Sequence, residues 1–401
     1  MKVVQINMVD YGSTGTIMKN LSETLLSLGH ESYTFSMKWK NNKNRKDSHH
    51  FYFGFYIENA FHQLMGKIFG LGGLFSVFGT KQLIGKIKKI NPDIIHLHNL
   101  HNCYVNVPMI LKFIKKRNIK CVLTMHDCWL ITGKCPHFLY SGCNKWKDKC
   151  GHCCSLKDYP VSKIDNSKKM LKIKKKLLSN MRLNIVTPSI WLKNIILDSY
   201  LKNNSIDVIE NGVNCKIFYR REISRDYLKL DQKKNIILGV ASNWTKQKGI
   251  EYFIKLAQKL DKNEYQIVLV GHVQDRTILK DLNVININKV SDPNELANLY
   301  SIADVFLNPT LEDTFPTVNM EANACGLPVI TFNTGGSCET ISGSSGIVIN
   351  EFTVKNIIDS IVRICKSKES FERHSVAESK NHHLEDSINH YIKYYERLLV
   401  K

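Results

Sequence analysis

The amino-acid sequence predicts an α/β fold with two doubly wound parallel sheets, one in each half of the chain. Short apolar runs of four to six residues alternate with amphipathic stretches in both halves, which is typical of parallel sheets covered by helices on both faces. The alternation breaks near residues 190–210, and 401 residues are enough for two domains. We therefore expect two domains, 1–195 and 205–384, that face a central cleft in which a ligand binds beyond the strand ends.

Eleven apolar runs are the candidate strands, the last of them the weakest. They are 2–6, 32–36, 94–98, 121–126 and 184–188 in the first half, and 235–241, 265–271, 284–288, 304–309, 328–332 and 345–349 in the second. Helical periodicity is clearest in 251–260, in 295–303 and after Pro316. The amphipathic stretch 385–401 predicts a C-terminal helix that packs back on the first domain.

The positive charge is confined to the first half. Residues 1–200 hold 31 Lys and Arg against 11 Asp and Glu, a formal charge of +20, whereas residues 201–401 hold 25 against 25. Such asymmetry indicates a polyanionic partner for one half, either nucleic acid or an anionic membrane surface. The basic run 167–182 is interpreted as solvated helix surface.

The stretch 51–79 is rich in aromatic and aliphatic residues, broken by glycines and followed by lysines. Two interpretations fit this composition: an interfacial membrane element, or a pair of core helices with basic edges. We expect no signal peptide and no membrane span, and hence a cytoplasmic protein. Twelve cysteines in such a chain indicate free thiols or metal ligands rather than disulfides.

Segment 311–326, LEDTFPTVNMEANACG, places two carboxylates eight positions apart around a proline. Pro316 disfavours a helix through Asp313, so we expect Asp313 in a loop and a helix that starts near Pro316 and carries Glu321. The amides of Thr317 and Val318 would face an anion at its first turn. A ligand with phosphates and hydroxyls fits this arrangement, and a capped surface helix is the alternative.

Two loops after predicted strands have residues suited to phosphate or sugar. Gly12 and Gly15 allow a tight turn after the first strand, where backbone amides approach a ligand closely. Lys246 and Lys248 precede a helix in the second half and could neutralise a diphosphate, or could be solvated surface lysines. The full dinucleotide fingerprint and the phosphate-loop motif are both missing.

His126 follows a predicted strand and precedes Asp127. It would lie at the cleft end of a parallel sheet, as a site residue or as a core histidine paired to backbone.

Taken together, the glycine loop, His126, the Lys248-Gly249 pair and the segment DTFPTVNMEANACGLPVI resemble the family 4 retaining glycosyltransferases. The resemblance covers nearly the whole chain and implies the GT-B fold, two Rossmann-like domains with the active site between them. Segments 126–153, 187–192, 210–214 and 239–244 look like the bacterial subgroup that builds surface polysaccharides such as O-antigen, capsule and colanic acid.

The resemblance implies roles for individual residues. Glu321 would bind the ribose hydroxyls of the nucleotide, Asp313 would lie at the donor sugar, Lys248 at the diphosphate, and His126 would approach the sugar from the other domain. Catalysis is thus expected from His126, Asp313 and Lys248. The expected donor-binding residues are Gly15, Asn243, Lys246, Lys248, Asp313, Phe315, Thr317, Val318 and Glu321.

Three positions depart from the family pattern. The first acid of its Glu-x7-Glu motif is Asp313, with Glu312 beside it. Asn243 stands where an arginine is usual, and Lys246 is the nearest substitute for that charge. The family's Pro-Asn-Gly-Val-Asp is Glu-Asn-Gly-Val-Asn at 210–214.

The implied reaction moves a sugar from a UDP-, GDP- or dTDP-sugar to a polyprenyl-diphosphate-linked saccharide, with retention at the anomeric carbon. No acidic nucleophile is obvious, which favours front-face attack assisted by the leaving phosphate. Lys248 and the helix N-terminus near Thr317 would stabilise that phosphate, so no catalytic cofactor is expected. The enzyme would act peripherally, at the inner face of the cytoplasmic membrane.

A cysteine-rich insertion is expected at about 128–160. Four of its cysteines have spacings of seven, six and two intervening residues, and Cys154 and several histidines are adjacent. They are Cys135, Cys143, Cys150 and Cys153. Only the last pair has zinc-knuckle spacing, so a structural zinc and a set of reduced thiols in an irregular loop are both open.

Two other functions compete with a transferase. A sugar-nucleotide epimerase of the same fold would carry a hydrolytic carboxylate pair, which the segment 311–326 matches less well. A basic nucleic-acid-binding module would leave that segment unexplained, and the sequence has no matching RNA- or DNA-binding motif, so no nucleic-acid partner is expected.

Overall fold

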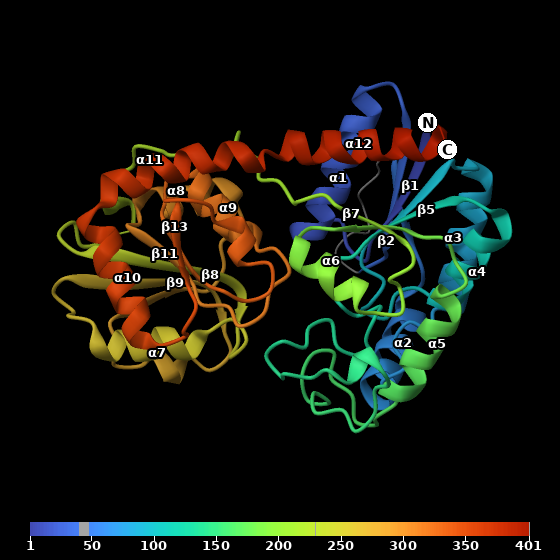
Figure 1. Ribbon diagram of the computed structural model, residues 1–401, viewed down its shortest axis with the longest axis horizontal. Helices are drawn as coiled ribbons and strands as arrows, with labels where there is room; N and C mark the ends of the chain where they lie inside the picture. The colour runs from blue at the N-terminus through green and yellow to red at the C-terminus, as the bar shows by residue number, and fades with distance from the viewer. Residues whose placement is uncertain (40–47, 229, 401) are drawn as a thin grey trace. The chain divides into compact units, whose positions relative to one another are not determined.

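A computed structural model describes residues 1–39, 48–228 and 230–400 of the chain. The chain forms two compact units, each with a parallel sheet between helices (Figure 1). Unit 1 comprises residues up to Ile209 together with the chain from Ile388 onward, and unit 2 comprises Glu210–Ser387. The first unit thus ends a few residues beyond the junction expected at 195–205, because its last strand lies there.

The sheet of unit 1 has seven parallel strands in the order β3-β2-β1-β4-β5-β6-β7. The strands are β1 (Lys2–Ile6), β2 (Glu31–Met37), β3 (His50–Phe53), β4 (Ile94–Leu97), β5 (Lys120–Thr124), β6 (Asn184–Thr187) and β7 (Ser205–Val208). All five strands predicted in this half are present. The two that were not predicted, β3 and β7, are the edge strands, where one side of the strand has no partner and polar residues are tolerated.

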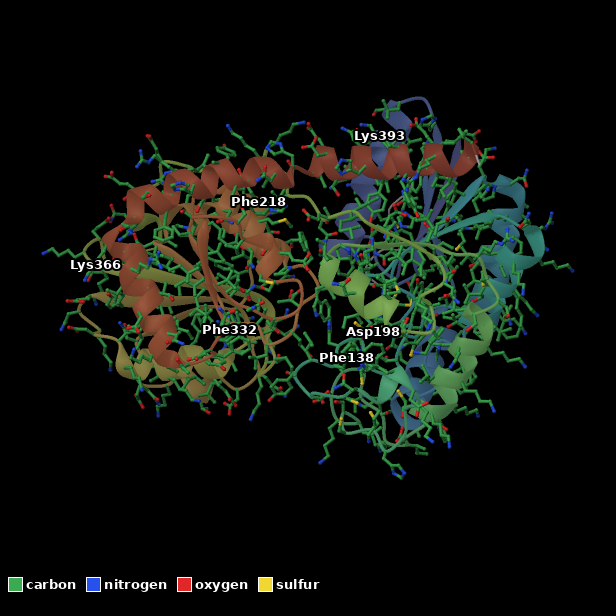
Figure 2. All side chains as sticks on the ribbon, in the orientation of Figure 1. Phe138, Asp198, Phe218, Phe332, Lys366 and Lys393 are labelled. Carbon is green, nitrogen blue, oxygen red and sulfur yellow. The ribbon has the colours of Figure 1, made fainter. Side chains whose placement is uncertain are left out.

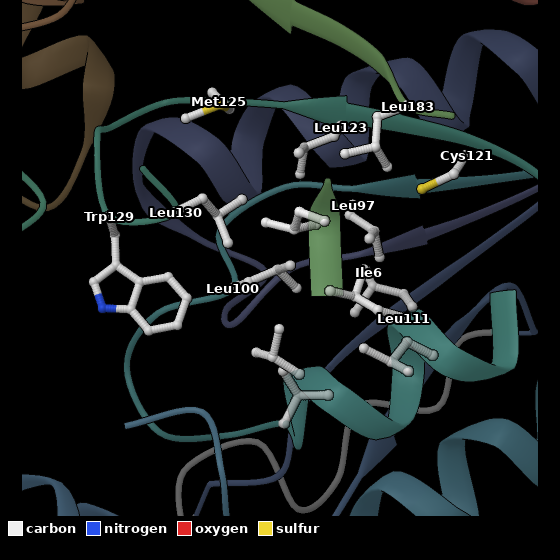
Figure 3. Close-up of a cluster of buried hydrophobic side chains, with 14 of the residues drawn as sticks. Ile6, Leu97, Leu100, Leu111, Cys121, Leu123, Met125, Trp129, Leu130 and Leu183 are labelled. Atoms are coloured by element: carbon white, nitrogen blue, oxygen red, sulfur yellow. The ribbon is translucent and has the colours of Figure 1, made fainter. Parts of the chain in front are cut away.

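The helices of unit 1 follow the strands in alternation. They are α1 (Gly12–Ser27), α2 (Tyr56–Phe69), α3 (Val77–Ile90), α4 (Val107–Arg117), α5 (Ser167–Leu178) and α6 (Ile190–Leu197). Figure 3 shows the core at the middle of this unit, where Ile6, Leu97 and Leu123 from adjacent strands meet Leu111 of α4. Burial of these continuous apolar runs explains why the strands could be recognised in the sequence.

The sheet of unit 2 has six parallel strands in the order β10-β9-β8-β11-β12-β13. Its strands are β8 (Asn235–Trp244), β9 (Tyr265–Val273), β10 (Val284–Ile287), β11 (Val305–Asn308), β12 (Val329–Phe332) and β13 (Gly346–Ile349). All six correspond to predicted strands. Its helices are α7 (Ile250–Lys259), α8 (Pro293–Ile302), α9 (Thr317–Ala324), α10 (Val354–Lys366) and α11 (Lys368–Ser379).

Side chains fill both faces of the sheet of unit 2 (Figure 2). Phe332 of β12 is buried and stacks on Phe352, with the ring centroids 4.3 Å apart. Lys366, at the end of α10, is exposed. Helices α7 and α10 likewise have apolar residues on one side and charged residues on the other, which explains why each packs its apolar side against the sheet.

The chain returns to unit 1 in its last helix, α12 (Leu384–Val400). Tyr391 and Tyr395 of this helix are buried there, and their hydroxyls lie 3.0 Å from Thr124 Oγ1 and 2.6 Å from His96 Nδ1. Lys401, the last residue of the expected helix 385–401, lies outside the described residues. Among the described helices, none is long and apolar enough to cross a membrane.

Candidate active site

The predicted site residues lie in two groups, one in each unit. In unit 2, Lys248 lies in the loop between β8 and α7. Its Nζ is 2.7 Å from Asp313 Oδ2, and both side chains are partly exposed. Gly249, which follows it, has φ of +79°, and a Cβ there would lie 2.2 Å from the carbonyl oxygen of Pro309. Only glycine fits this close approach, so the backbone conformation at Gly249 fixes the position from which the Lys248 side chain extends.

Asp313 lies in a loop, as predicted, and that loop rests on a second glycine turn. The amide of Gly336 donates to the carbonyl oxygen of Asp313 at 3.0 Å, and a Cβ at Gly335 would lie 2.0 Å from the same oxygen. The amide of Phe315 donates to Asp313 Oδ1 at 3.3 Å. Asp313 is therefore held from two sides while its other carboxylate oxygen binds Lys248.

Helix α9 begins at Thr317, directly after Pro316, which supplies no side-chain cap to the first turn. The first-turn amides of Thr317 and Val318 therefore carry the positive end of the helix dipole. Glu321 is one turn further along, and its Oε2 accepts a hydrogen bond from Tyr300 at 3.2 Å. Burial raises the pKa of Glu321 to about 7, although the hydrogen bonds from Tyr300 and Thr317 act in the opposite direction.

Asn319 connects α9 to the sheet, and sequence reasoning missed it. The residue is fully buried: its Oδ1 accepts from Asn308 at 2.8 Å, and its Nδ2 donates to Thr340 Oγ1 at 2.8 Å and to Ser337 Oγ at 3.4 Å. A fully bonded polar network of this kind rigidifies the element it holds. Two features of the sequence could have indicated this network: a polar residue inside an otherwise buried helix, and the Gly335-Gly336 pair after β12.

Three other donor-binding candidates of unit 2 have different surroundings. Asn243 is exposed at the end of β8. Lys246 is exposed as well, and its Nζ is 2.9 Å from Glu251 rather than beside Asp313. Phe315 is buried and packs edge-on against His382, so its side chain contributes to the core of the unit. Their contacts with a donor stay predictions.

In unit 1, His126 lies at the end of β5 and stacks on His98, whose Nδ1 is 3.3 Å from His126 Nε2. Burial lowers the pKa of His126 to about 4, against a small opposite effect of Asp127. The imidazole is therefore neutral near pH 7 and can both donate and accept a hydrogen bond. Asp127 itself lies 3.5 Å from His101 Nε2.

Gly15 is buried in the first turn of α1. A Cβ at this position would lie 2.6 Å from the carbonyl carbon of Asp10. The glycine thus permits the helix to pack on the preceding loop, and its expected role in donor binding stays a prediction.

The four cysteines expected to bind zinc form no disulfide among the described residues. Cys135 is hydrogen-bonded to Cys153, Cys143 to Cys154, and Cys150 Sγ accepts from the amide of Gly133 at 3.2 Å. Across the described ranges, no three His, Cys, Asp or Glu side chains are arranged to hold a metal ion. The four thiols lie close enough to shift one another's pKa, and a zinc ion held by them stays a prediction.

The chain resembles known glycosyltransferases in sequence and in fold. The chain is 24% identical over 312 residues to the putative colanic acid biosynthesis glycosyl transferase WcaC of Escherichia coli, covering 71% of this chain and 72% of that one. It is 23% identical over 214 residues to the N,N'-diacetylbacillosaminyl-diphospho-undecaprenol alpha-1,3-N-acetylgalactosaminyltransferase of Campylobacter jejuni, covering 50% and 56%. The structure of HepE from Anabaena in complex with UDP-glucose has the same fold, with a TM-score of 0.68 at 13% identity over 99% of this chain and 100% of that one.

Two family models divide the chain between them. The model described as Glycosyltransferase Family 4 matches residues 14–217, a little over half of the chain, and the model described as Glycosyl transferases group 1 matches residues 220–381. These matches bear out a transferase rather than an epimerase or a nucleic-acid-binding module. The chain belongs to glycosyltransferase family 4 and is a glycosyltransferase with the GT-B fold.

Proposed function

We propose that this enzyme transfers a sugar, with retention at the anomeric carbon, from a nucleotide-diphosphate sugar to a polyprenyl-diphosphate-linked saccharide in bacterial surface-polysaccharide assembly. The donor would be a UDP-, GDP- or dTDP-sugar. The observation that carries the proposal is the group in unit 2 formed by the Lys248–Asp313 pair, the uncapped start of α9 and Glu321. It offers cationic, amide and carboxylate groups, which suit diphosphate and hydroxyl groups.

Each part of the donor has a matching partner in this group. The diphosphate would compete with Asp313 for Lys248 and accept hydrogen bonds from the amides of Thr317 and Val318. A carboxylate accepts two hydroxyl hydrogens at once, so Glu321 suits the vicinal hydroxyls of a ribose. Asp313, freed from Lys248, would accept a hydrogen bond from the donor sugar.

The proposed chemistry is front-face attack by the acceptor hydroxyl. As the bond from the anomeric carbon to the diphosphate oxygen breaks, negative charge grows on that oxygen, and Lys248 with the start of α9 stabilises it. The departing phosphate takes the proton of the acceptor hydroxyl. Neutral His126 would hydrogen-bond a sugar hydroxyl, and no further cofactor is proposed because the cations supply the stabilisation.

The acceptor and location rest on the relatives. The Campylobacter jejuni relative is named for a diphospho-undecaprenol substrate, and the Escherichia coli relative for colanic acid biosynthesis. We extend both to this chain as a lipid-linked acceptor and a polysaccharide product. The enzyme would accordingly work at the cytoplasmic face of the membrane, bound peripherally to anionic lipid.

Glu321→Ala tests the donor site. Thermal unfolding with UDP-, GDP- and dTDP-sugars should find one donor class that stabilises the wild type, by about 2.7 kcal/mol at a hundredfold excess over Kd. That stabilisation should be lost in Glu321→Ala and kept in Glu295→Ala, which removes an exposed carboxylate from α8. Equal stabilisation of both variants would refute the ribose assignment.

Lys248→Ala tests the reaction itself. Because the cation stabilises the leaving diphosphate, kcat should fall at least tenfold, whereas Lys255→Ala, an exposed lysine on α7, should leave it unchanged. The anomeric configuration of the product, read by NMR against that of the donor, decides between retention and inversion.

A further inference from the structure

Helix α2 presents its apolar side outward. Its buried residues are Asn59 and His62, both polar, whereas Ile57, Phe61 and Leu64 are exposed, with Ile57 at 87%. Residues 57, 61 and 64 share one face of a helix, and residues 59 and 62 lie on the opposite face. The helix is therefore reversed relative to an ordinary surface helix, which buries its apolar stripe.

Specific hydrogen bonds hold α2 in this reversed orientation. His62 Nε2 accepts from the amide of Gly73 at 2.9 Å, and its Nδ1 lies 2.8 Å from Ser76 Oγ. At the first turn, Glu58 accepts from the amides of Phe78 and Gly79 at 2.7 and 2.8 Å. Rotating the helix to bury Phe61 and its neighbours would break all of these hydrogen bonds. The hydrogen bonds therefore stabilise the orientation in which the apolar stripe faces outward.

The apolar surface continues on both sides of the helix. The amide of Ile164 donates to the carbonyl oxygen of Ile68 at 2.9 Å, which places the loop 159–164 beside the end of α2 (Figure 1). We call this surface the α2 face. It comprises Phe55, Ile57, Phe61, Leu64, Val77, Phe78, Tyr159, Val161 and Ile164, nine of the nineteen exposed large apolar side chains among the described residues. Nearly half of them thus lie on α2 and on the two segments that are hydrogen-bonded to it.

Cations flank the α2 face. Lys67, Lys81 and Lys163 are exposed beside it, and Lys81 Nζ is 5.7 Å from the centroid of the Phe78 ring. The sequence of unit 1 holds 35 Lys and Arg against 13 Asp and Glu, a formal charge of +22, whereas unit 2 holds 21 against 23, or −2. Exposed aromatic and aliphatic residues bordered by lysines on a strongly positive unit fit anionic lipid. A second copy of the same face would instead bring lysines together.

An apolar cavity adjoins the same surface. It has a volume of about 510 Å³, and its lining includes Gly66, Gly70, Trp129, Tyr159 and Val161. Tyr159 and Val161 therefore belong both to the cavity wall and to the α2 face. A lipid-linked molecule at the bilayer surface would have an apolar recess next to it.

We propose that the α2 face docks unit 1 on the surface of an anionic bilayer, with its apolar side chains in the interface and the flanking lysines on the lipid headgroups. The inference deepens the proposed function, since the use of such docking rests on a lipid-linked acceptor. Of the two interpretations of the stretch 51–79, the proposal takes the interfacial element and assigns it to α2. The buried apolar side chain of this stretch, Phe53, belongs to strand β3 rather than to a helix.

The test is co-sedimentation of the full chain with vesicles of phosphatidylcholine, with and without phosphatidylglycerol. Wild type should bind the mixed vesicles, and high salt should weaken the binding without abolishing it. Phe61→Ser with Leu64→Ser should lower the partition coefficient roughly tenfold or more. Leu28→Ser with Leu197→Ser, which removes two exposed apolar residues of unit 1 away from the α2 face, should bind as wild type.

Two outcomes would overturn the proposal. The first is that the Phe61/Leu64 variant binds vesicles as well as the wild type does. The second is that sedimentation velocity finds the wild type as a dimer and this variant as a monomer, because the α2 face would then be the interface between two copies of the chain. Donor binding without vesicles checks that each variant is folded. It also separates the two proposals: a chain that binds vesicles but no nucleotide-sugar refutes the proposed function and leaves the docking surface standing.

Discussion

Glu321 is a carboxyl group whose position on α9 works against its ionisation. Burial raises its pKa from 4.5 to about 7 in the folded chain. Between these pH values the folded protein holds a proton that the unfolded chain has released, so its stability falls as pH rises through this window. A group that costs stability when ionised is typical of a functional site.

Glu321→Gln should therefore change the pH profile of stability. The amide does not titrate, so the variant should unfold a few degrees above wild type at pH values beyond 7 and close to wild type near pH 4.5. Differential scanning calorimetry across this range measures the difference. Parallel profiles of the two proteins would show that Glu321 titrates near its ordinary pKa.

The local structure around single residues was predictable where spacing carried the information, whereas their roles in a site stay predictions. Pro316 predicted that Asp313 lies in a loop and that Glu321 lies on a helix, and Gly249 predicted that Lys248 lies just before a helix. Tyr300, the partner of Glu321, was not predicted, because it lies 21 residues away and only the folding of α8 brings the two together. Contacts between residues that are far apart in the sequence cannot be predicted from local spacing.

Lys174 shows the same limit within a basic run. The run 167–182 was interpreted as solvated surface, but Lys174 is buried, and its Nζ donates to the carbonyl oxygen of Trp129 at 2.5 Å. Burial lowers its pKa to about 7. The signal was its position between Met170 and Leu178, in register with the apolar face of α5.

At the scale of elements, the sequence predicted the strands of unit 2, the central strands of unit 1 and, most clearly among the helices, α7, α8, α9 and α12. It missed β3 and β7, the edge strands of unit 1, and it left open whether the stretch that contains α2 lies in the core or at an interface. That choice depends on His62 and Glu58 finding partners in the segment 73–79. Hydrophobic periodicity locates an apolar stripe, but the direction of the stripe depends on tertiary contacts.

The turn between β8 and α7 depends on Gly249. Gly249→Ala should lower the stability of unit 2 by about 2–4 kcal/mol, because the residue needs a left-handed conformation and its Cβ would clash with Pro309. Gly343→Ala is the matched control: it is also left-handed, but nothing lies within 4 Å of the added carbon. It should cost about 1–2 kcal/mol. Urea unfolding of both variants gives the comparison, and equal losses would mean that the Pro309 contact relaxes.

At the scale of the whole molecule, charge and chain path distinguish the two units. The charge asymmetry seen along the sequence follows the units, and the last helix sharpens it, because the chain from Ile388 onward belongs to unit 1. The sequence indicated that a C-terminal helix returns to the first domain. It did not indicate the partners of that helix, since His96 and Tyr395 are 299 residues apart.

Tyr395 provides the test of this return. Tyr395→Ala removes a fully buried ring and leaves His96 Nδ1 without its hydroxyl partner, so unit 1 should lose about 3–5 kcal/mol. Leu399→Ala, on the same helix but 38% exposed, should cost much less. Hydrogen exchange read by mass spectrometry reports each unit separately. Exchange should rise in β4, β5 and β6 and stay unchanged in β8, β9 and β11. A uniform rise across both sheets would show that the two units unfold as one, and that α12 stabilises the whole chain rather than unit 1.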